Sequence, residues 1–148
     1  MNTKSKSKMI NFLLNSGKKR TSETIVLQNL KQVQKKTKKN SIQVIKSAIT
    51  NTTPIFKIEQ QKSKKGKRKT TRNVPTFIVS HSSRTLVAIK ELCQSSIKSR
   101  KLTNSTFFKE LSNEILDSFT HKSGSVNKKT EIHKQAFLNK RYLTKFKW

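Results

Sequence analysis

The chain has 148 residues, of which 34 are Lys or Arg and 7 are Asp or Glu, so its formal net charge at pH 7 is +27. Apolar residues make up 31% of the chain, which allows one domain with a modest core. So many like charges on a small body repel one another strongly. We therefore expect a polyanion to be part of the native state.

The composition disfavours several classes of protein. The longest apolar runs have four or five residues, far short of the ~20 that cross a bilayer. A membrane-surface binder is also disfavoured, because the few apolar faces are needed for a core. The single cysteine, Cys93, can form neither a disulfide framework nor a zinc knuckle. There is no glycine-rich phosphate loop or nucleophile elbow, so we expect neither an enzyme nor a cofactor.

The N-terminal part of the chain shows helical periodicity. Residues 1–8 are basic and polar and are predicted to form a flexible tail, so the folded domain is expected to span residues 9–148. An apolar stripe that begins at Met9 predicts a first helix, which ends near Gly17.

Two further helices are predicted before the first proline. Thr21 or Ser22 is expected to cap the second helix, with Glu23 in its first turn. This helix is expected to fade within the lysine run 35–39. A pattern typical of a capping box begins at Asn40 and predicts the start of the third helix.

Between Pro54 and His81 the apolar period changes from about 3.6 to about 2 residues, which is typical of strands. The segment at about 55–80 is therefore predicted to be a β-hairpin arm. Its middle, 62–69, is almost entirely cationic and is interpreted as the tip, where Gly66 is the residue suited to a turn. Because an isolated hairpin is marginally stable, we expect the arm to project from a helical body.

Helical periodicity resumes after the arm. Ser82 or Ser83 is predicted to cap the fourth helix, and the strongest apolar stripe of the chain follows at 107–119 before Gly124 ends it. A basic segment completes the chain. The sequence thus predicts an all-α helical bundle with one projecting β-hairpin arm and basic, flexible termini. The fourth helix is expected to bury one face, formed by Leu86, Ile89, Leu92, Cys93 and Ile97.

Lysine and arginine gather at the ends of the predicted helices, in the arm and at both termini. For one cluster a solvated surface is the simpler interpretation, but several clusters with almost no acidic partners favour a polyanion. These side chains neutralise phosphates and release counterions, so affinity falls steeply with salt. This signal does not by itself separate RNA from DNA or a membrane surface. The residues predicted to bind, with RNA as the preferred polyanion, are Lys4, Lys6, Lys8, Lys18, Lys19, Arg20, Lys62, Lys64, Lys65, Lys67, Arg68, Lys69, Arg72, Arg84, Lys98, Arg100, Lys101, Lys128, Lys129, His133, Arg141, Lys145, Lys147 and Trp148.

Three of the seven acids share one face of a predicted helix. Glu110, Glu114 and Asp117 stand at positions i, i+4 and i+7. One interpretation is a divalent-metal site. A polar face opposite the apolar stripe is favoured, because residues from one helix rarely complete an oxygen cage, and no metal is therefore expected.

The other reactive side chains are scattered. Among the three histidines, His133 is the preferred RNA contact because it lies in the basic final segment. Cys93 lies on an apolar face and is predicted to be buried and inert. Tyr142 and Trp148 are equally compatible with stacking on bases and with fastening the last helix to the body.

Several segments form a recognisable series along the chain. They are Gly17–Val26, Asn40–Pro54, Val74-Pro75, Arg84–Lys90, Leu111–Asp117, Lys128–His133 and Phe146–Trp148. Together they resemble, in order and spacing over about residues 8–148, the family of the small-subunit ribosomal protein numbered seven. The arm differs from the family's arm, since it is longer and lysine-rich and has only Gly66 where the family has an arginine pair and two glycines.

The resemblance implies a helical bundle with a projecting hairpin, bound to the 3′ major domain of small-subunit rRNA. It implies a protein that nucleates assembly of the subunit head and lies near the tRNA exit site, where the hairpin approaches tRNA and mRNA. The implied partners also include neighbouring head proteins and a platform protein, with no membrane and no homo-oligomer. Richness in Lys, Asn, Ser and Ile favours A/T-rich coding, and hence an organelle-encoded protein of the mitochondrial ribosome in the matrix.

Two other functions are compatible with parts of the pattern. A DNA-compacting architectural protein would need a minor-groove wedge or a repeated basic unit, and the sequence shows neither. An RNA nuclease could combine His133 with the acidic stripe, and it would be recognised by cleavage that His133→Ala abolishes. The ribosomal hypothesis is preferred over both.

Overall fold

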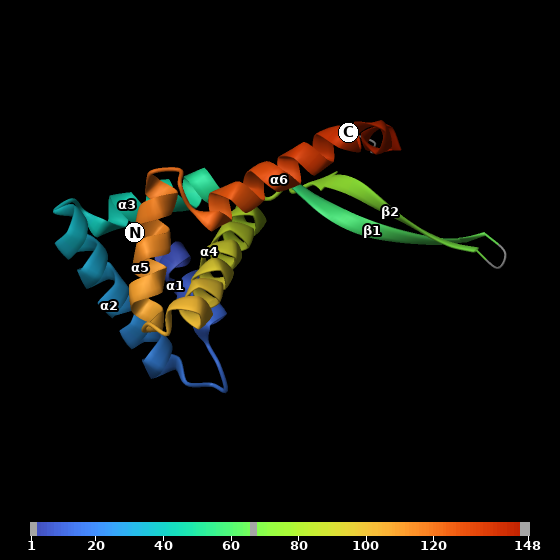
Figure 1. Ribbon diagram of the computed structural model, residues 1–148. Coiled ribbons are helices and arrows are strands. Elements are labelled where there is room, and N and C mark those ends of the chain that lie inside the picture. The colour runs from blue at the N-terminus through green and yellow to red at the C-terminus, as the bar shows by residue number, and fades with distance from the viewer. Residues whose placement is uncertain (1–2, 66–67, 146–148) are drawn as a thin grey trace.

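The computed structural model describes residues 3–65 and 68–145. It consists of a helical body from which a two-stranded arm projects (Figure 1). The predicted all-α bundle with a β-hairpin arm is thereby confirmed. None of the helices in the described part is long and apolar enough to cross a membrane. The elements are α1 (Thr3–Leu13), α2 (Lys19–Thr37), α3 (Ser41–Thr52), β1 (Phe56–Lys65), β2 (Arg68–Phe77), α4 (His81–Thr103), α5 (Phe107–Phe119), α6 (Gly124–Leu138) and the 3₁₀ helix η1 (Lys140–Lys145).

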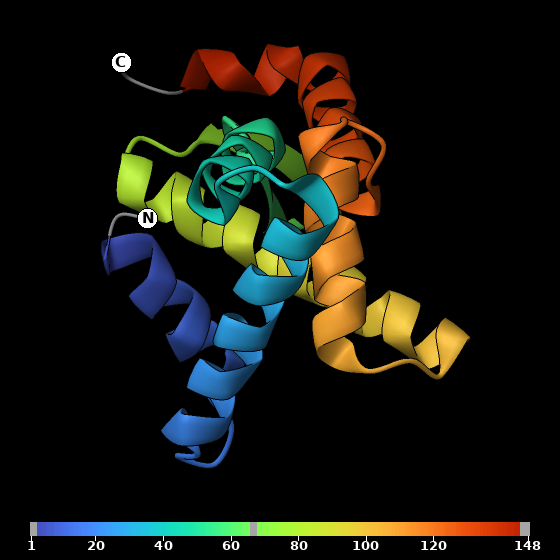
Figure 2. The ribbon, with the colours of Figure 1, turned by 90° about the vertical axis from the view of Figure 1, so that its left-hand side faces the viewer.

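Helix α5 packs against α2, α3 and α4 and stands to one side of α2 and α3 in Figure 2. Its apolar stripe explains this position, because Leu111 and Ile115 are completely buried. Full burial of such a side chain contributes about 1.5–3 kcal/mol. The core around them is formed by Met9, Ile10, Val26, Val33, Val44, Ile45, Ala48, Ile49, Ala88, Ile89, Leu92 and Cys93.

The predicted face of α4 is only partly buried. Ile89, Leu92 and Cys93 are in the core as expected, whereas Leu86 and Ile97 are 50% and 41% exposed. The expectation for these two residues is therefore wrong. They lie toward the ends of α4, and the other helices cover its middle.

The predicted helix starts are wrong at three places. Helix α1 begins at Thr3, so most of the expected tail is helical, and its Lys8 ammonium donates to the Ser82 carbonyl oxygen at 2.9 Å. Helix α2 begins at Lys19 rather than after Thr21 or Ser22, which places Glu23 beyond the first turn. Helix α4 begins at His81, before the predicted caps Ser82 and Ser83. Helices α2 and α4 extend past the expected polar caps, and α1 extends past the expected start of its apolar stripe into the basic residues before it.

The boundaries of α3 follow the prediction closely. The Asn40 side chain accepts a hydrogen bond from the Ile42 amide at 3.1 Å, as an N-cap does. The helix ends at Thr52, because Thr53 precedes Pro54 and a proline disfavours helical backbone in the residue before it.

The arm is an antiparallel pair whose register runs from Phe56 opposite Phe77 to Lys65 opposite Arg68. The segment 62–69 was expected to be the tip, but its described residues continue the ladder, so that prediction is wrong. Strand pairing uses backbone groups, so a cationic sequence does not prevent the ladder from continuing. Gly66, the predicted turn residue, lies outside the described residues. Each strand has ten residues and is about 33 Å long.

Candidate nucleic-acid interface

The turn between α1 and α2 presents three adjacent cations. Ser16 and Gly17 have positive φ values of 50° and 71°, so the chain reverses sharply just before helix α2. Glycine suits the second position because it has no Cβ to strain. The turn leaves three exposed residues at the start of α2, which we name the α1–α2 cluster: Lys18, Lys19 and Arg20.

A second group of cations lies at the end of α4. This end juts out at one corner of the bundle, where Asn104 takes a left-handed conformation with φ 51° and stops the helix (Figure 2). Basic residues at a helix C-terminus are favoured by the helix dipole. The exposed members, which we name the α4 cluster, are Lys98, Arg100 and Lys101.

The arm carries the third group. Lys62 and Arg72 are exposed, and the register places Lys64 opposite Lys69 and Lys65 opposite Arg68. Of the other predicted residues, Lys4 belongs to α1, Lys6 is half-buried on it, and Lys145 ends η1. Arg141 lies over the Tyr142 ring, with 5.0 Å between its guanidinium carbon and the ring centroid. Lys67, Lys147 and Trp148 lie outside the described residues.

Besides Arg141, five residues that the sequence assigned to RNA have contacts within the protein. Lys8 bonds to Ser82, and the Lys128 ammonium pairs with Glu91 at 2.5 Å. The other three, Arg84, Lys129 and His133, all lie where the arm joins the body. Their contacts with RNA remain predictions, whereas their structural contacts were not foreseen.

We name this junction the arm root: Asn51, Ile55, Phe56, Phe77 and Ile78. The segment that enters β1 and the segment that leaves β2 are joined by a hydrogen bond, in which the Ile78 amide donates to the Ile55 carbonyl oxygen at 3.0 Å. The Phe56 and Phe77 rings contact each other with their centroids 4.6 Å apart and their planes tilted by 44°. These two contacts hold the two ends of the arm together.

Basic side chains from two helices fasten the arm root to the body. The Arg84 Nε of α4 donates to the Ile78 carbonyl oxygen at 2.5 Å, and the Lys129 ammonium of α6 donates to the Asn51 carbonyl oxygen at 2.8 Å. His133 of α6 accepts the Ile55 amide on Nε2 at 3.3 Å. Burial lowers the pKa of Lys129, and burial together with the charge of Lys129 lowers the pKa of His133.

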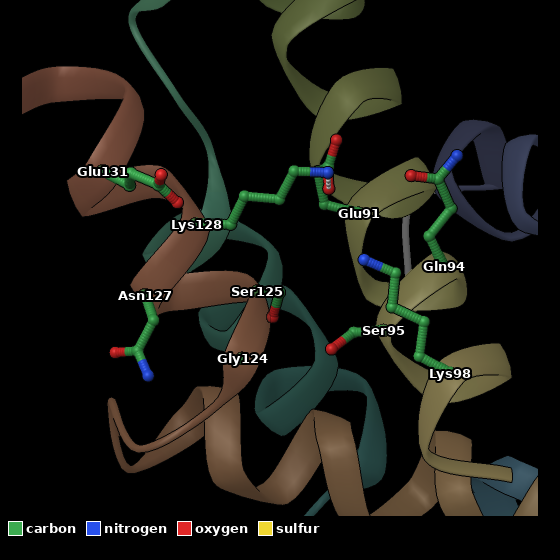
Figure 3. A pocket seen from close by; sticks show the side chains of 9 residues that line it. All are labelled: Glu91, Gln94, Ser95, Lys98, Gly124, Ser125, Asn127, Lys128 and Glu131. Atoms are coloured by element: carbon green, nitrogen blue, oxygen red, sulfur yellow. Dashed lines mark ion pairs between the residues drawn. The ribbon is translucent and has the colours of Figure 1, made fainter. Parts of the chain in front are cut away.

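A cleft of about 380 Å³ lies between α4 and α6 (Figure 3). The fold brings Lys98 and Lys128 together here, and the Lys128 side chain crosses the cleft to Glu91. Two lysines and two glutamates balance in charge among its lining residues, so the cleft does not favour a polyanion. Its lining residues are Glu91, Gln94, Ser95, Lys98, Gly124, Ser125, Asn127, Lys128 and Glu131.

The acidic stripe of α5 is not uniformly exposed to solvent. Glu114 is only 7% exposed, and its Oε1 accepts the Ser125 amide at 3.0 Å. Glu110 accepts the Ser105 hydroxyl at 2.6 Å, while Asp117 is exposed. The expectation of a polar outer face is thus wrong for Glu114, which caps the start of α6. The described residues hold no group of three side chains arranged to ligate a metal.

The thiol of Cys93 is completely buried, and burial raises its pKa to about 12. The prediction of a buried, inert cysteine is confirmed. A thiol with so high a pKa stays protonated near neutral pH and cannot act as a nucleophile.

Sequence reasoning named no site residue in the lysine run at the end of α2, although it noticed the run. There the left-handed Lys38, with φ 53°, ends the helix, and Lys35, Lys38 and Lys39 are exposed. It also missed two apolar side chains of α6 that remain in solvent, since Phe137 and Leu138 are 70% and 77% exposed. The signal for the lysines was their density, which is as high as in the selected clusters.

Comparison with known proteins gives a consistent result. The model of the family described as ribosomal protein S7p/S5e matches residues 1–140. The chain is 29% identical to small ribosomal subunit protein uS7m of Reclinomonas americana over 141 residues, which cover 95% of this chain and 83% of the relative. It is 30% identical to small ribosomal subunit protein uS7 of Mesomycoplasma hyopneumoniae strain 7448 over 147 residues, which cover 99% of this chain and 88% of the relative.

Proposed function

Because the chain belongs to the ribosomal protein S7p/S5e family, we propose that it binds the 3′ major domain of small-subunit rRNA and nucleates assembly of the subunit head. The family is structural and non-enzymatic, and its role is in the ribosome and in translation.

The observation that supports the proposal is the separation of the exposed cations. The α1–α2 cluster, the α4 cluster and the arm belong to different parts of the molecule (Figures 1 and 2). A polyanion that engages all three must itself be folded in three dimensions. Structured RNA meets this requirement, since it is recognised by its shape through phosphate and 2′-hydroxyl contacts.

The arm supports the finer part of the proposal. An extension about 33 Å long allows cations to reach RNA beyond the segment that the body covers. We therefore place the arm beside tRNA and mRNA at the exit site, with head and platform proteins as neighbours of the body. The similarity to the mitochondrial-type uS7m of Reclinomonas americana and the lysine- and asparagine-rich composition favour a mitochondrial ribosome.

Two measurements test the proposal. The tagged chain should sediment with small ribosomal subunits at moderate salt, and because binding relies on many phosphate contacts, the fraction retained should fall steeply as the salt concentration rises. In competition binding, a transcript of the 3′ major domain should displace labelled RNA far better than duplex DNA of equal length. Preference for the duplex would overturn the proposal in favour of a DNA-compacting protein.

A further inference from the structure

We propose that His133 is a positioning residue that fixes the direction in which the arm leaves the helical body. It does so by accepting the Ile55 amide on its neutral Nε2. This inference rests on the proposed function, since the fixed direction matters because body and arm bind one folded RNA.

The position of His133 is suited to this task. The chain passes from α3 into β1 through Pro54 and Ile55. His133 contacts Ile55 and Phe56, the two residues at which the arm begins. Its Nε2 accepts the Ile55 amide at 3.3 Å, and its ring meets the Phe56 ring edge-on at 5.6 Å between centroids. The hydrogen bond holds the backbone of Ile55, and the ring contact, with its ring planes at 85°, holds the side chain of Phe56, so the two together restrict the direction in which the arm leaves the body.

A small change at this point has a large effect at the far end. Because the strands are about 33 Å long, a rotation of roughly 10° at the arm root moves the outer end by about 6 Å. That displacement is comparable to the spacing between neighbouring phosphates. The arm root therefore determines whether cations of the arm and of the α1–α2 cluster meet the same RNA surface together.

The bond requires one protonation state of the imidazole. Nε2 accepts from an N–H group, so the ring carries its proton on Nδ1. Protonation of Nε2 would place two donors against each other and break the bond. Burial of the imidazole and, after it, the charge of the Lys129 ammonium one helical turn away on α6 lower the pKa of His133 and so disfavour that protonation.

The other charged side chains on the surrounding elements do not act on the protonation of His133 as Lys129 does. Lys57 and Glu59 of β1 pair with each other at 2.5 Å. Lys134 of α6, Lys46 of α3 and Arg72 of β2 are exposed. We therefore expect the arm root to loosen as the pH falls through the lowered pKa of His133.

Two substitutions separate the acceptor from the ring. His133→Gln keeps a side-chain oxygen that can accept the Ile55 amide, whereas His133→Phe keeps a ring against Phe56 and has no acceptor. His81→Gln is the matched control, because His81 is exposed at the start of α4. Circular dichroism of each full-length variant first establishes that the helices are retained.

The direction of the arm is measured as a distance distribution between spin labels on cysteines introduced at Thr71 on β2 and Lys109 on α5, both exposed. The native thiol is buried and does not compete for the label. Wild type, His81→Gln and His133→Gln should give one narrow distribution at pH 7.5. His133→Phe should give a broad one, and its affinity for the 3′ major domain transcript should fall about fivefold.

The pH dependence tests the same bond without a substitution. The wild-type distribution should broaden between pH 7.5 and 5, and that of His133→Gln should stay narrow. A wild-type distribution that is broad at pH 7.5, unchanged by pH, or matched by His133→Phe would overturn the inference. If the distances behave as expected but no variant prefers the transcript over duplex DNA, the proposed function fails and the positioning role stands.

Discussion

Glu114 offers a sharp test of how α5 and α6 are joined. The first amides of a helix have no partner within the helix. In α6, the Ser123 hydroxyl accepts the Val126 amide at 3.1 Å and Glu114 accepts the Ser125 amide at 3.0 Å. A hydrogen bond to a charged group contributes about 1.5–3 kcal/mol, and a carboxylate at a helix N-terminus adds about 0.3–1 kcal/mol. Glu114→Ala should therefore lower the free energy of unfolding by about 2–4 kcal/mol.

Urea unfolding at pH 7 in 0.5 M salt, followed by circular dichroism, measures this loss. Asp117→Ala is the matched control, because it raises the net charge by the same amount but removes an exposed carboxylate; we expect a change of less than about 0.5 kcal/mol. Glu114→Gln keeps an acceptor and should fall between the two. Equal losses for Glu114→Ala and Asp117→Ala would refute the capping role and leave general charge repulsion as the cause.

Three further predictions concern the RNA surface, the core and the thiol. Alanine at all three positions of the α1–α2 cluster should reduce the slope of log affinity against log salt by about 2–3 for the 3′ major domain transcript. Filter binding over a salt series measures this slope. An unchanged slope would show that the cluster is not part of the RNA interface. Leu111→Ala should cost about 2–5 kcal/mol in urea unfolding, whereas Leu102→Ala, at an 87% exposed position, should cost less than about 0.5 kcal/mol. Burial raises the pKa of Cys93 from 9.0 to about 12, so the unfolded chain loses its thiol proton first and stability should fall as the pH rises above 9. Cys93→Ala should abolish that part of the pH dependence.

The sequence predicted those parts of the fold that depend on local signals. The stripe that becomes α5 and the cap at Asn40 each reflect a periodicity or a hydrogen bond within a few residues. Thr21 and Ser22 misled the prediction, because both are good caps in isolation. In the folded protein Ser22 is buried, and the Thr21 hydroxyl donates back to the Lys18 carbonyl oxygen at 2.6 Å.

The sequence predicted which cations belong to the candidate interface, but not which of them are exposed and which make contacts within the protein. Lys129 and its acceptor on Asn51 are 78 residues apart in the chain, and Lys128 reaches an acid on another helix. Such pairs depend on the packing of α6 against the body. Composition and spacing therefore indicated which side chains carry charge, and only the fold separated those that face outward from those that hold the arm.

The two-stranded form of the arm has a consequence for the chain before it meets RNA. In the described ladder, β1 and β2 pair only with each other, so each strand keeps one open edge. Open edges invite pairing with other copies and hence fibril growth. The lysine-rich outer half opposes this, because two such arms brought edge to edge would place like charges side by side. The same cations thus oppose strand pairing between copies of the arm.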